Sequence, residues 1–440
     1  MLEMLPTPFG LVRFGVAPDH PEVKSVMNEF NKVASDTRFR FLGNVCVGED
    51  VTLSELQQHY HAIVLAYGAA GDRQLNIPGE NLNGVMSARS FVNWYNGHPS
   101  FCNLKLDLTQ IETAVVIGHG NVGVDCARLL TKNVEELAST DIADYAIEAL
   151  RKSKIRNVVI IGRRGSTQAA FTMKELRELT KLDGVKCVVD PEDLRRSITP
   201  ASEQEMRDQR GRKRMNDVLN MAAEHFDTAI DTKRVVQIKF LSLPIEFLAD
   251  ESDPMRVGAI RVEKTKLEGK ANQQRAVGTG DFEVIPCGLV LRSIGYKSEP
   301  IDMAIPFDTS RDVIANDQGR VVTYSDGKSH PIVGLYCTGW VKRGPTGIIG
   351  TNIMDARETV SCILDDFATG KCLNSSDKDL KGLEAVESLI KKRNPDKQVV
   401  RWADYERVNT EEKRRGEMVG KPREKITSVD EMLEIVKSGY

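Results

Sequence analysis

The sequence predicts an α/β fold, in which buried parallel strands alternate with helices. Residues 61–69 and 113–118 are apolar runs that lead into a glycine, a pattern typical of parallel strands covered on both faces. The second run continues into a glycine-rich turn and a helix expected at 121–131. A chain of 440 residues is too long for one small core and fits two or three domains.

The N-terminal segment predicts short elements. Glycines and prolines punctuate residues 8–18, which indicates a loop. Pro21 suits the first turn of a helix that we expect to reach Ala34. The next expected elements are strands at 39–42 and 44–47, a helix at 54–59 and the strand at 61–69.

Beyond the glycine-rich turn, strands and helices continue to alternate. Residues 203–213 are densely charged, which indicates a solvated segment. The expected elements are an inserted helix at about 134–153, a strand at 155–161, a helix at 172–182, antiparallel strands at 235–241 and 257–267, a parallel strand at 288–294, a strand and turn at 334–340, a helix from 346 to 367 and a charged, helical tail at 373–440.

Composition excludes several function classes. The formal net charge of -3 provides no basic field for nucleic acid, and no apolar run is long enough to span a bilayer. Residues 1–15 resemble neither a secretory signal nor an arginine-rich transit peptide. The 8 cysteines form no C-x-x-C pair, which favours reduced structural thiols over a zinc, iron–sulfur or redox dithiol site. We therefore expect no bound metal.

The pattern G-x-G-x-x-G at 118–123 is weak alone, but it lies between an expected strand and an expected helix. Gly118 allows the tight turn, Gly120 lets the backbone approach a diphosphate, and Gly123 lets the helix pack closely on the strand. The helix N-terminus would offer free N–H groups and the positive end of its dipole to the phosphates. These residues predict a Rossmann-type dinucleotide site, with a plain glycine turn as the alternative.

The next strand ends at Gly162-Arg163-Arg164-Gly165. An NAD or FAD site has an acidic residue here for the ribose 2′-hydroxyl, whereas an NADP site has arginine for the 2′-phosphate. The two arginines favour NADP, with a solvated basic turn as the alternative. Their separation from the glycine turn exceeds the usual spacing of about 20 residues, which is why a helix must be inserted between them.

Five segments resemble adrenodoxin reductase and its ferredoxin–NADP reductase relatives. They are PFGLVRFGVAPDHPEVK (8–24), GHGNVGVDCARLL (118–130), GRRGSTQAAFTMKELREL (162–179), SIGYKSEPID (293–302) and GWVKRGPTGIIGTN (339–352). They keep the family's order over nearly the whole chain. The resemblance implies FAD and NADP as cofactors and electron transfer from NADPH to a [2Fe-2S] ferredoxin (adrenodoxin), for mitochondrial P450 and steroid pathways or for iron–sulfur and haem pathways.

Residue roles follow from the resemblance, position by position. The matching NADP contacts are Gly118, His119, Gly120, Asn121, Val122, Gly123, Arg163, Arg164, Glu175 and Gly347. The matching FAD contacts are Glu3, Leu11, Val47, Trp340, Gly347, Ile348 and Ile349. His20 and Glu178 match a pair near the nicotinamide and are the catalytic candidates. A loop cap and a solvated helix face are their respective alternatives.

Ferredoxins of this kind are acidic, so a basic surface should meet them in a salt-sensitive encounter. The candidate partner-binding residues are Arg177, Arg210, Arg212, Lys213 and Arg214. A solvated charged helix is the alternative for the run at 210–214. The resemblance further implies a mitochondrial location on the matrix side of the inner membrane. It allows a peripheral membrane association and favours a monomer.

The resemblance also predicts the domain division. Residues 1–106 and 331–440 would form a discontinuous FAD-binding domain, and 107–330 the NADP-binding domain, both doubly wound and three-layered. The family's first βαβ unit, with its own glycine turn for FAD, has no counterpart in this sequence, so the FAD domain is expected to be truncated at its N-terminus.

An NADP-binding isoform or fragment that cannot hold FAD is therefore a second hypothesis, and colourless purified protein would distinguish it. Two other flavoprotein classes fit less well. A disulfide reductase needs a C-x-x-C pair, and an amidotransferase-type subunit needs iron–sulfur cysteines before Cys46.

Overall fold

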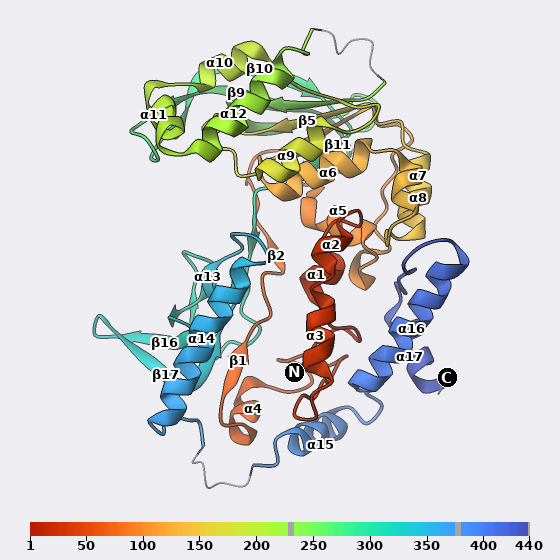
Figure 1. Cartoon of the computed structure of the whole chain (residues 1–440), viewed down its shortest axis with the longest axis vertical. Coiled ribbons are helices and arrows are strands. Elements are labelled where there is room, and N and C mark those ends of the chain that lie inside the picture. The colour runs from red at the N-terminus through yellow and green to blue at the C-terminus, as the bar shows by residue number, and fades with distance from the viewer. Residues whose placement is uncertain (228–232, 375–379, 439–440) are drawn as a thin grey trace.

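A computed structural model describes residues 1–227, 233–374 and 380–438 (Figure 1). The central part of the chain forms an upper body built on a six-stranded sheet. Below it, the N-terminal helices lie between a smaller sheet with its long helix on one side and the C-terminal helices on the other (Figure 1). The chain is an α/β protein, as the sequence predicts.

The six-stranded sheet is parallel throughout. Its order is β3 (Val85–Ser87), β11 (Leu289–Arg292), β4 (Thr113–Ile117), β5 (Asn157–Ile161), β7 (Val235–Lys239) and β6 (Lys186–Val189). The prediction of an antiparallel strand at 235–241 was wrong. Helix α12 (Arg210–Ala223) precedes β7, and a helical crossover returns the chain in the parallel direction.

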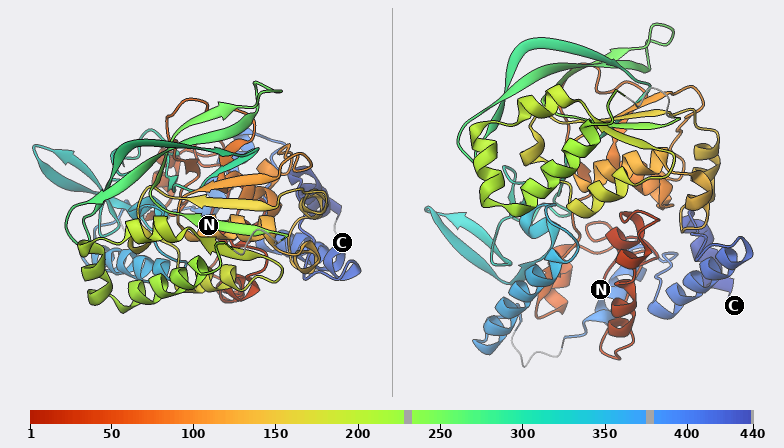
Figure 2. Two further views of the ribbon diagram at one scale, coloured as in Figure 1. Left: turned by 90° about the horizontal axis from the view of Figure 1, so that it is seen from above. Right: turned by 45° about the horizontal axis from the view of Figure 1, so that its top comes forward.

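The two faces of this sheet have different covers (Figure 2). Ala114 and Val116 pack under the helices, whereas Val115 and Ile117 face a three-stranded antiparallel sheet. The helices on or beside this body are α5 (Ala88–Tyr95), α6 (Asn121–Thr131), α7 (Val134–Ala138), α8 (Asp144–Arg151), α9 (Met173–Thr180), α10 (Pro191–Ser197), α11 (Pro200–Asp208) and α12. The antiparallel sheet consists of β8 (Ser242–Ala249), β9 (Val257–Glu268) and β10 (Arg275–Pro286).

Two expectations in this body need correction. The inserted helix at about 134–153 is a pair of short helices, α7 and α8. The charged segment at 203–213 is not solvated throughout, because Glu205 on α11 is fully buried and its carboxylate accepts the Asn272 N–H at 2.6 Å. A carboxylate can be buried here because it also pairs with Arg212.

The smaller sheet has the order β1 (Ile63–Leu65), β17 (Lys328–Cys337), β16 (Arg320–Ser325) and β15 (Asn316–Asp317). β1 pairs with β17 in parallel and the other pairs are antiparallel. Helices α13 (Trp340–Arg343) and α14 (Thr351–Ala368) follow β17. The remaining short strands are β2 (Gly71–Asp72) with β12 (Tyr296–Lys297), and β13 (Phe307–Asp308) with β14 (Val313–Ile314).

The N-terminal segment is more helical than its glycines and prolines suggest. Helix α1 (Gly10–Phe14) lies where a loop was expected, and the expected helix from Pro21 is divided into α2 (Pro21–Lys24) and α3 (Met27–Ala34). The strands expected at 39–42 and 44–47 are reduced to isolated bridges, such as Leu42 with Leu2. The short helices α4 (Leu53–His59), η1 (Pro99–Phe101) and η2 (Ser166–Gln168) complete the elements outside the tail.

The tail forms α15 (Leu383–Arg393), α16 (Trp402–Met418) and α17 (Val429–Ser438). Its apolar residues pack back onto the start of the chain, where the Phe9 ring lies 5.9 Å from the Tyr405 ring. All 8 cysteines are free thiols. Among the described residues, no helix combines the length and the apolar character that a membrane span requires.

Candidate functional site

The glycine turn at 118–123 has the conformation that its sequence predicts. Gly118 has φ +121°, and a Cβ there would lie 2.2 Å from the carbonyl oxygen of Ser293. A Cβ at Gly123 would lie 2.6 Å from the carbonyl oxygen of Gly118. Both positions therefore require glycine, one for the turn between β4 and α6 and the other for the close approach of α6 to β4.

Gly120 differs from its neighbours because a Cβ there would meet nothing within 4 Å. The backbone at this point is open to a ligand. The N–H groups of Asn121, Val122 and Gly123 find no acceptor in the described part of the chain, and the first helical bond is that of Val124 N–H to the Gly120 carbonyl at 3.2 Å. Free N–H groups at the N-terminus of an 11-residue helix are suited to binding a diphosphate.

Arg163 and Arg164 lie beside this turn. β4 and β5 are in register at Ile117 and Ile161, and the Gly118 N–H donates to the Ile161 carbonyl at 2.8 Å. The two arginines follow directly after Gly162 at the same carboxyl edge, and both are exposed. Within the described residues neither guanidinium has an ion pair, so both remain available to an anion on the ligand.

The His119 side chain turns inward, away from the phosphate position. Its ring lies 4.8 Å from the Phe240 ring, and Nε2 lies 3.3 Å from the Ile160 carbonyl oxygen. Burial lowers the pKa of His119 to about 4. The His119 carbonyl accepts the N–H groups of Ala170 and Phe171, each at 2.8 Å. His119 therefore supports the turn, and only its backbone lies on the ligand side.

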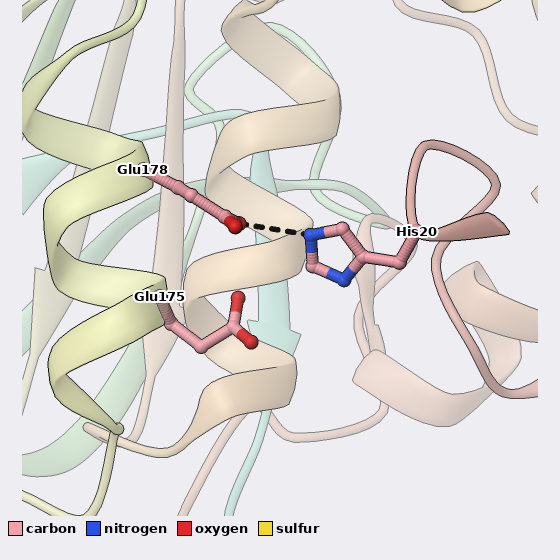
Figure 3. A group of neighbouring side chains, drawn as sticks. All are labelled: His20, Glu175 and Glu178. Carbon is pink, nitrogen blue, oxygen red and sulfur yellow. Dashed lines mark hydrogen bonds and ion pairs between the residues drawn. The ribbon is translucent and has the colours of Figure 1, made fainter. Parts of the chain in front are cut away.

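His20 and Glu178 are brought together from segments 158 residues apart (Figure 3). The Nε2 atom of His20, in the loop between α1 and α2, lies 2.8 Å from a carboxylate oxygen of Glu178 on α9. The His20 side chain is 9% exposed, and that of Glu178 is 34% exposed. The structure thus forms the pair that the family resemblance implies.

Glu175 lies one turn away from Glu178 on the same helix and also faces His20 (Figure 3). Burial, followed by the nearby charge of Asp125, raises the pKa of Glu175. Its Oε2 atom is buried without a hydrogen-bond partner among the described residues. One ligand atom from each of His20, Glu175 and Glu178 fits within 4.8 Å, a geometry that a metal ion could use.

An ion-pair network lies next to this cluster. Arg128 on α6 is 2% exposed and pairs with both Asp19 and Asp125. Burial alone would lower the pKa of Arg128, but the two carboxylates raise it. Lys132 contacts Asp19 at 3.1 Å. A cavity of about 770 Å³ opens here and is lined by Asp19, His20, Glu22, Arg128, Lys132, Glu136, Lys174, Arg177, Glu178, Lys181, Leu182 and Asp183.

The residues expected at the flavin follow β17. Trp340 is half-buried and its ring lies 5.6 Å from that of Tyr296. Gly347 has φ +82°, and the N–H groups of Gly347, Ile348 and Ile349 find no acceptor in the described chain. These free donors just before α14 suit the carbonyl oxygens of a flavin ring and negative charge on it.

One short stretch links the two regions. The Ser293 carbonyl lies against Gly118, whereas Tyr296 packs on Trp340. Three residues of extended chain span at most about 10–11 Å. The glycine turn and Trp340 therefore lie at the two ends of this one short stretch, although they are far apart in the sequence.

Three FAD candidates lie in the N-terminal segment, where their surroundings do not by themselves indicate a flavin site. Glu3 is half-buried, and its carboxylate accepts the Leu5 N–H at 3.1 Å. Leu11 on α1 is 37% exposed, and Val47 forms a bridge with Val51. Burial raises the pKa of Glu3. Their roles remain predictions from the resemblance.

The candidate partner-binding residues are not equivalent. Arg177 is exposed at the cavity beside His20, and Arg210, Lys213 and Arg214 are exposed on α12. Arg212 is held by the buried carboxylate of Glu205. It is therefore less available to a partner than its neighbours.

Sequence reasoning missed the supports of the site. The Asn121 side chain accepts the Thr172 N–H at 2.7 Å, which ties the start of α9 to the glycine turn. Asp355 accepts the Gly339 N–H and so fixes the turn before Trp340. Arg128 and Asp19 were also missed. No local pattern marks these residues as parts of the site, because partners that reveal their roles, such as Thr172, Gly339 and Asp19, come from other segments.

No protein-family model matches the chain. It is 46% identical over 437 residues to a protein of Arabidopsis thaliana named NADPH:adrenodoxin oxidoreductase, mitochondrial, with 98% of this chain and 89% of the relative covered. It is 42% identical over 442 residues to the NADPH-ferredoxin reductase FprA of Mycobacterium tuberculosis, with 99% and 91% covered. A structure of FprA from Mycobacterium tuberculosis in complex with NADPH superimposes with a TM-score of 0.89 at 41% identity, covering 99% of this chain and 92% of that chain.

Proposed function

The chain belongs to the NADPH:adrenodoxin oxidoreductase family, and from this premise we propose that it transfers electrons from NADPH, through bound FAD, to a ferredoxin. The observation that carries the proposal is the pair of exposed, unpaired guanidinium groups of Arg163 and Arg164 beside the glycine turn. The 2′-phosphate of NADPH needs such fixed positive charge. NADH has a neutral 2′-hydroxyl at the same position of the ribose and so gains nothing from the two arginines.

The residues for NADPH fit a dinucleotide along the carboxyl edge of the six-stranded sheet. The N–H groups of Asn121, Val122 and Gly123 would hold the diphosphate, with Gly120 leaving room for it. Arg163 and Arg164 would hold the 2′-phosphate. We place Glu175 and Gly347 at the nicotinamide end, between this edge and Trp340.

The residues present also fit the ring end of FAD. Trp340 would pack beside the ring, and the free N–H groups at Gly347, Ile348 and Ile349 would meet its polar edge. We assign the adenosine and remaining backbone contacts to Glu3, Leu11 and Val47. We assign the smaller sheet with its helices to FAD and the six-stranded body to NADP. The expected boundaries at 106 and 331 then need adjustment, because β3 and α5 (85–95) pack in the six-stranded body and β15 and β16 (316–325) pair in the smaller sheet. Bound FAD would supply the conversion of a two-electron hydride donor into single-electron transfers.

The chain itself contributes position and charge. Because residues 293–296 connect the glycine turn to the Trp340 ring, a bound NADPH would have its nicotinamide beside the flavin, and this orientation would lower the entropic barrier to hydride transfer. His20 and Glu178 would orient the nicotinamide and manage protons at its edge, because their hydrogen-bonded pair faces an open cavity.

We further propose a [2Fe-2S] ferredoxin as the partner and a monomer as the active form. Its acidic surface would be attracted by exposed basic side chains, namely Arg177, Arg210, Lys213 and Arg214. Arg212 would contribute less, because it is paired with Glu205. We propose a mitochondrial location, on the matrix side of the inner membrane; the organelle alone is supported by the relative from Arabidopsis thaliana, whose name includes it. The bacterial relative shows that the enzyme type is not confined to that compartment.

The decisive experiment measures flavin content and turnover on the same purified protein. We expect bound FAD and anaerobic reduction of a [2Fe-2S] ferredoxin by NADPH, with two ferredoxins reduced per NADPH because each accepts a single electron. NADH should be a much poorer donor. Colourless protein that binds NADPH without reducing ferredoxin would instead establish the NADP-binding isoform as the function.

A further inference from the structure

His20 lies in a segment that buried ion pairs hold at both ends, at one end to the C-terminal part of the chain and at the other to Asp141 between α7 and α8. Arg13 precedes it on α1 and pairs with Glu412 on α16, the two side chains being 2% and 0% exposed. Lys24 follows it at the end of α2 and contacts Asp141 at 2.6 Å. Residues 13–24 are therefore fixed at points on either side of the imidazole.

A different C-terminal residue takes part at each end, Glu412 at Arg13 and Lys425 at Asp141. Glu412 also accepts from Arg423 and from the Ile426 N–H, each at 3.0 Å. Asp141 also forms an ion pair with Lys425, whose ammonium lies 2.9 Å from the second carboxylate oxygen of Asp141. Removing one partner of such a pair leaves an uncompensated buried charge, so the tail is coupled to this segment directly through Glu412 and, by way of Asp141, through Lys425.

Asn96 adds a backbone support between these two ends. Its amide donates to the carbonyls of Phe14 and Val16, at 3.0 and 3.1 Å, and its carbonyl oxygen lies 3.4 Å from the Lys24 ammonium. Asn96 is 0% exposed. The path from α1 to the His20 loop is thus fixed by hydrogen bonds as well as by ion pairs.

We propose that Glu412 and Lys425, which line no part of the cavity beside His20, are positioning residues that hold the His20 imidazole against Glu178. The inference rests on the proposed function for its kinetic consequence. The structural part of the inference, that Glu412 and Lys425 keep His20 in contact with Glu178, does not depend on catalytic turnover. The C-terminal part of the chain then acts on the reaction through segment 13–24.

The kinetic test is a double-mutant cycle of Glu412→Gln with His20→Ala in the FAD-loaded protein, with the rate of hydride transfer from NADPH measured by stopped flow. We expect Glu412→Gln to slow this step roughly 10- to 100-fold, because small misplacements of reacting groups have effects of that size. In the His20→Ala background the same substitution should change the rate less than about twofold, since the effect passes through His20. Affinity for NADP⁺ should be unchanged, and Lys413→Gln, an exposed neighbour on α16, is the control.

A merely structural role predicts equal losses in both backgrounds, or a lower unfolding temperature with no change in rate, and either result would overturn the proposal. If Glu412→Gln does not fold, Lys425→Met takes its place, because Asp141 then keeps Lys24 as a partner. The expected slowing is smaller, about 3- to 10-fold, and it must also vanish without His20.

A spectroscopic readout separates this inference from the proposed function. In ¹⁵N-histidine-labelled protein, the His20 Nε2 resonance, assigned by its loss in His20→Ala, should shift in the same direction in Glu412→Gln and in Glu178→Gln. An unchanged resonance in Glu412→Gln would overturn the inference even in an active enzyme. A shifted resonance in a protein without ferredoxin reductase activity would overturn the proposed function and leave the positioning role established.

Discussion

The carboxyl edge of the six-stranded sheet and the ion pairs that hold segment 13–24 both depend on arginine, but in opposite states. Arg163 and Arg164 are exposed and have no ion pair within the described residues. Arg13 and Arg128 are each 2% exposed and pair with buried carboxylates. The first pair is available to a ligand, whereas the second pair is already satisfied within the protein.

The difference teaches how to assign a role to a cation. A buried guanidinium must be paired, so its partners reveal what it holds in place. An exposed, unpaired arginine is usually solvated and has no role. It becomes informative only where the backbone beside it is also open, as at Gly120. Substitutions in the two regions should therefore separate stability from cofactor recognition.

The largest effect should come from Arg128→Met. Asp19 and Asp125 would lose their shared partner in a buried place, which should lower the free energy of unfolding by about 3–5 kcal/mol. Urea denaturation measures this loss. The matched control is Arg151→Met, which removes an exposed ion pair with Glu135 and should cost far less. Equal losses in the two variants would show that burial does not distinguish these arginines.

Second in size is the double substitution Arg163→Ala with Arg164→Ala. Loss of two charge-assisted contacts should reduce kcat/KM for NADPH roughly 10²- to 10³-fold, while kcat/KM for NADH changes little. Unfolding should be unaffected, because neither side chain has a partner in the described structure. Arg156→Ala, at the opposite end of β5, controls for loss of general positive charge. An unchanged preference for NADPH would refute the assignment.

The glycine-turn region and the buried ion-pair network also differ in how well the sequence predicts them. Helix α6 begins and ends at the expected residues, and β4, the glycine turn and the arginines lie where the motif places them. These features form within a continuous stretch, so local pattern is sufficient. The orientation of β7 was predicted wrongly, because alternating apolar residues indicate a half-buried strand but do not specify its direction.

The network around His20 could not be predicted from sequence. Arg13 and Glu412 are 399 residues apart, and arginine and glutamate are ordinarily surface residues. Nothing local marks either of them as buried. The burial of Glu205 was missed for the same reason, since its partners Arg212 and Asn272 are joined to it by tertiary packing. The pair of His20 and Glu178 was reached only through the family resemblance.

The third prediction concerns acid sensitivity at the glycine turn. His119 has a pKa of about 4 in the folded protein and an ordinary value of 6.5 when unfolded. The unfolded chain therefore binds a proton first, and stability falls as the pH drops below 6.5 toward 4. Between pH 7 and pH 5 this residue should cost about 2 kcal/mol of unfolding free energy. His119→Gln, which does not titrate, should lose about that much less than the parent protein over the same interval.

The smallest effect distinguishes two glycines of a single turn. Gly120→Ala should leave the unfolding temperature unchanged, because its φ of −102° suits alanine and the added Cβ meets no protein atom within 4 Å. It should weaken NADP⁺ binding roughly tenfold, about 1.4 kcal/mol, because the methyl group occupies space needed by the diphosphate.

Gly118→Ala is the matched opposite. Its φ of +121° and the Ser293 carbonyl at 2.2 Å from an added Cβ make it unfavourable without any ligand. It should lower the unfolding temperature before cofactor binding is considered. Calorimetry with and without NADP⁺ measures both the unfolding temperature and the affinity for the cofactor. If the Gly120→Ala protein is destabilised yet binds NADP⁺ normally, the open backbone at Gly120 faces solvent rather than the cofactor. The contrast matters because both glycines belong to one motif, and only their surroundings separate the glycine that shapes the turn from the glycine that admits the ligand.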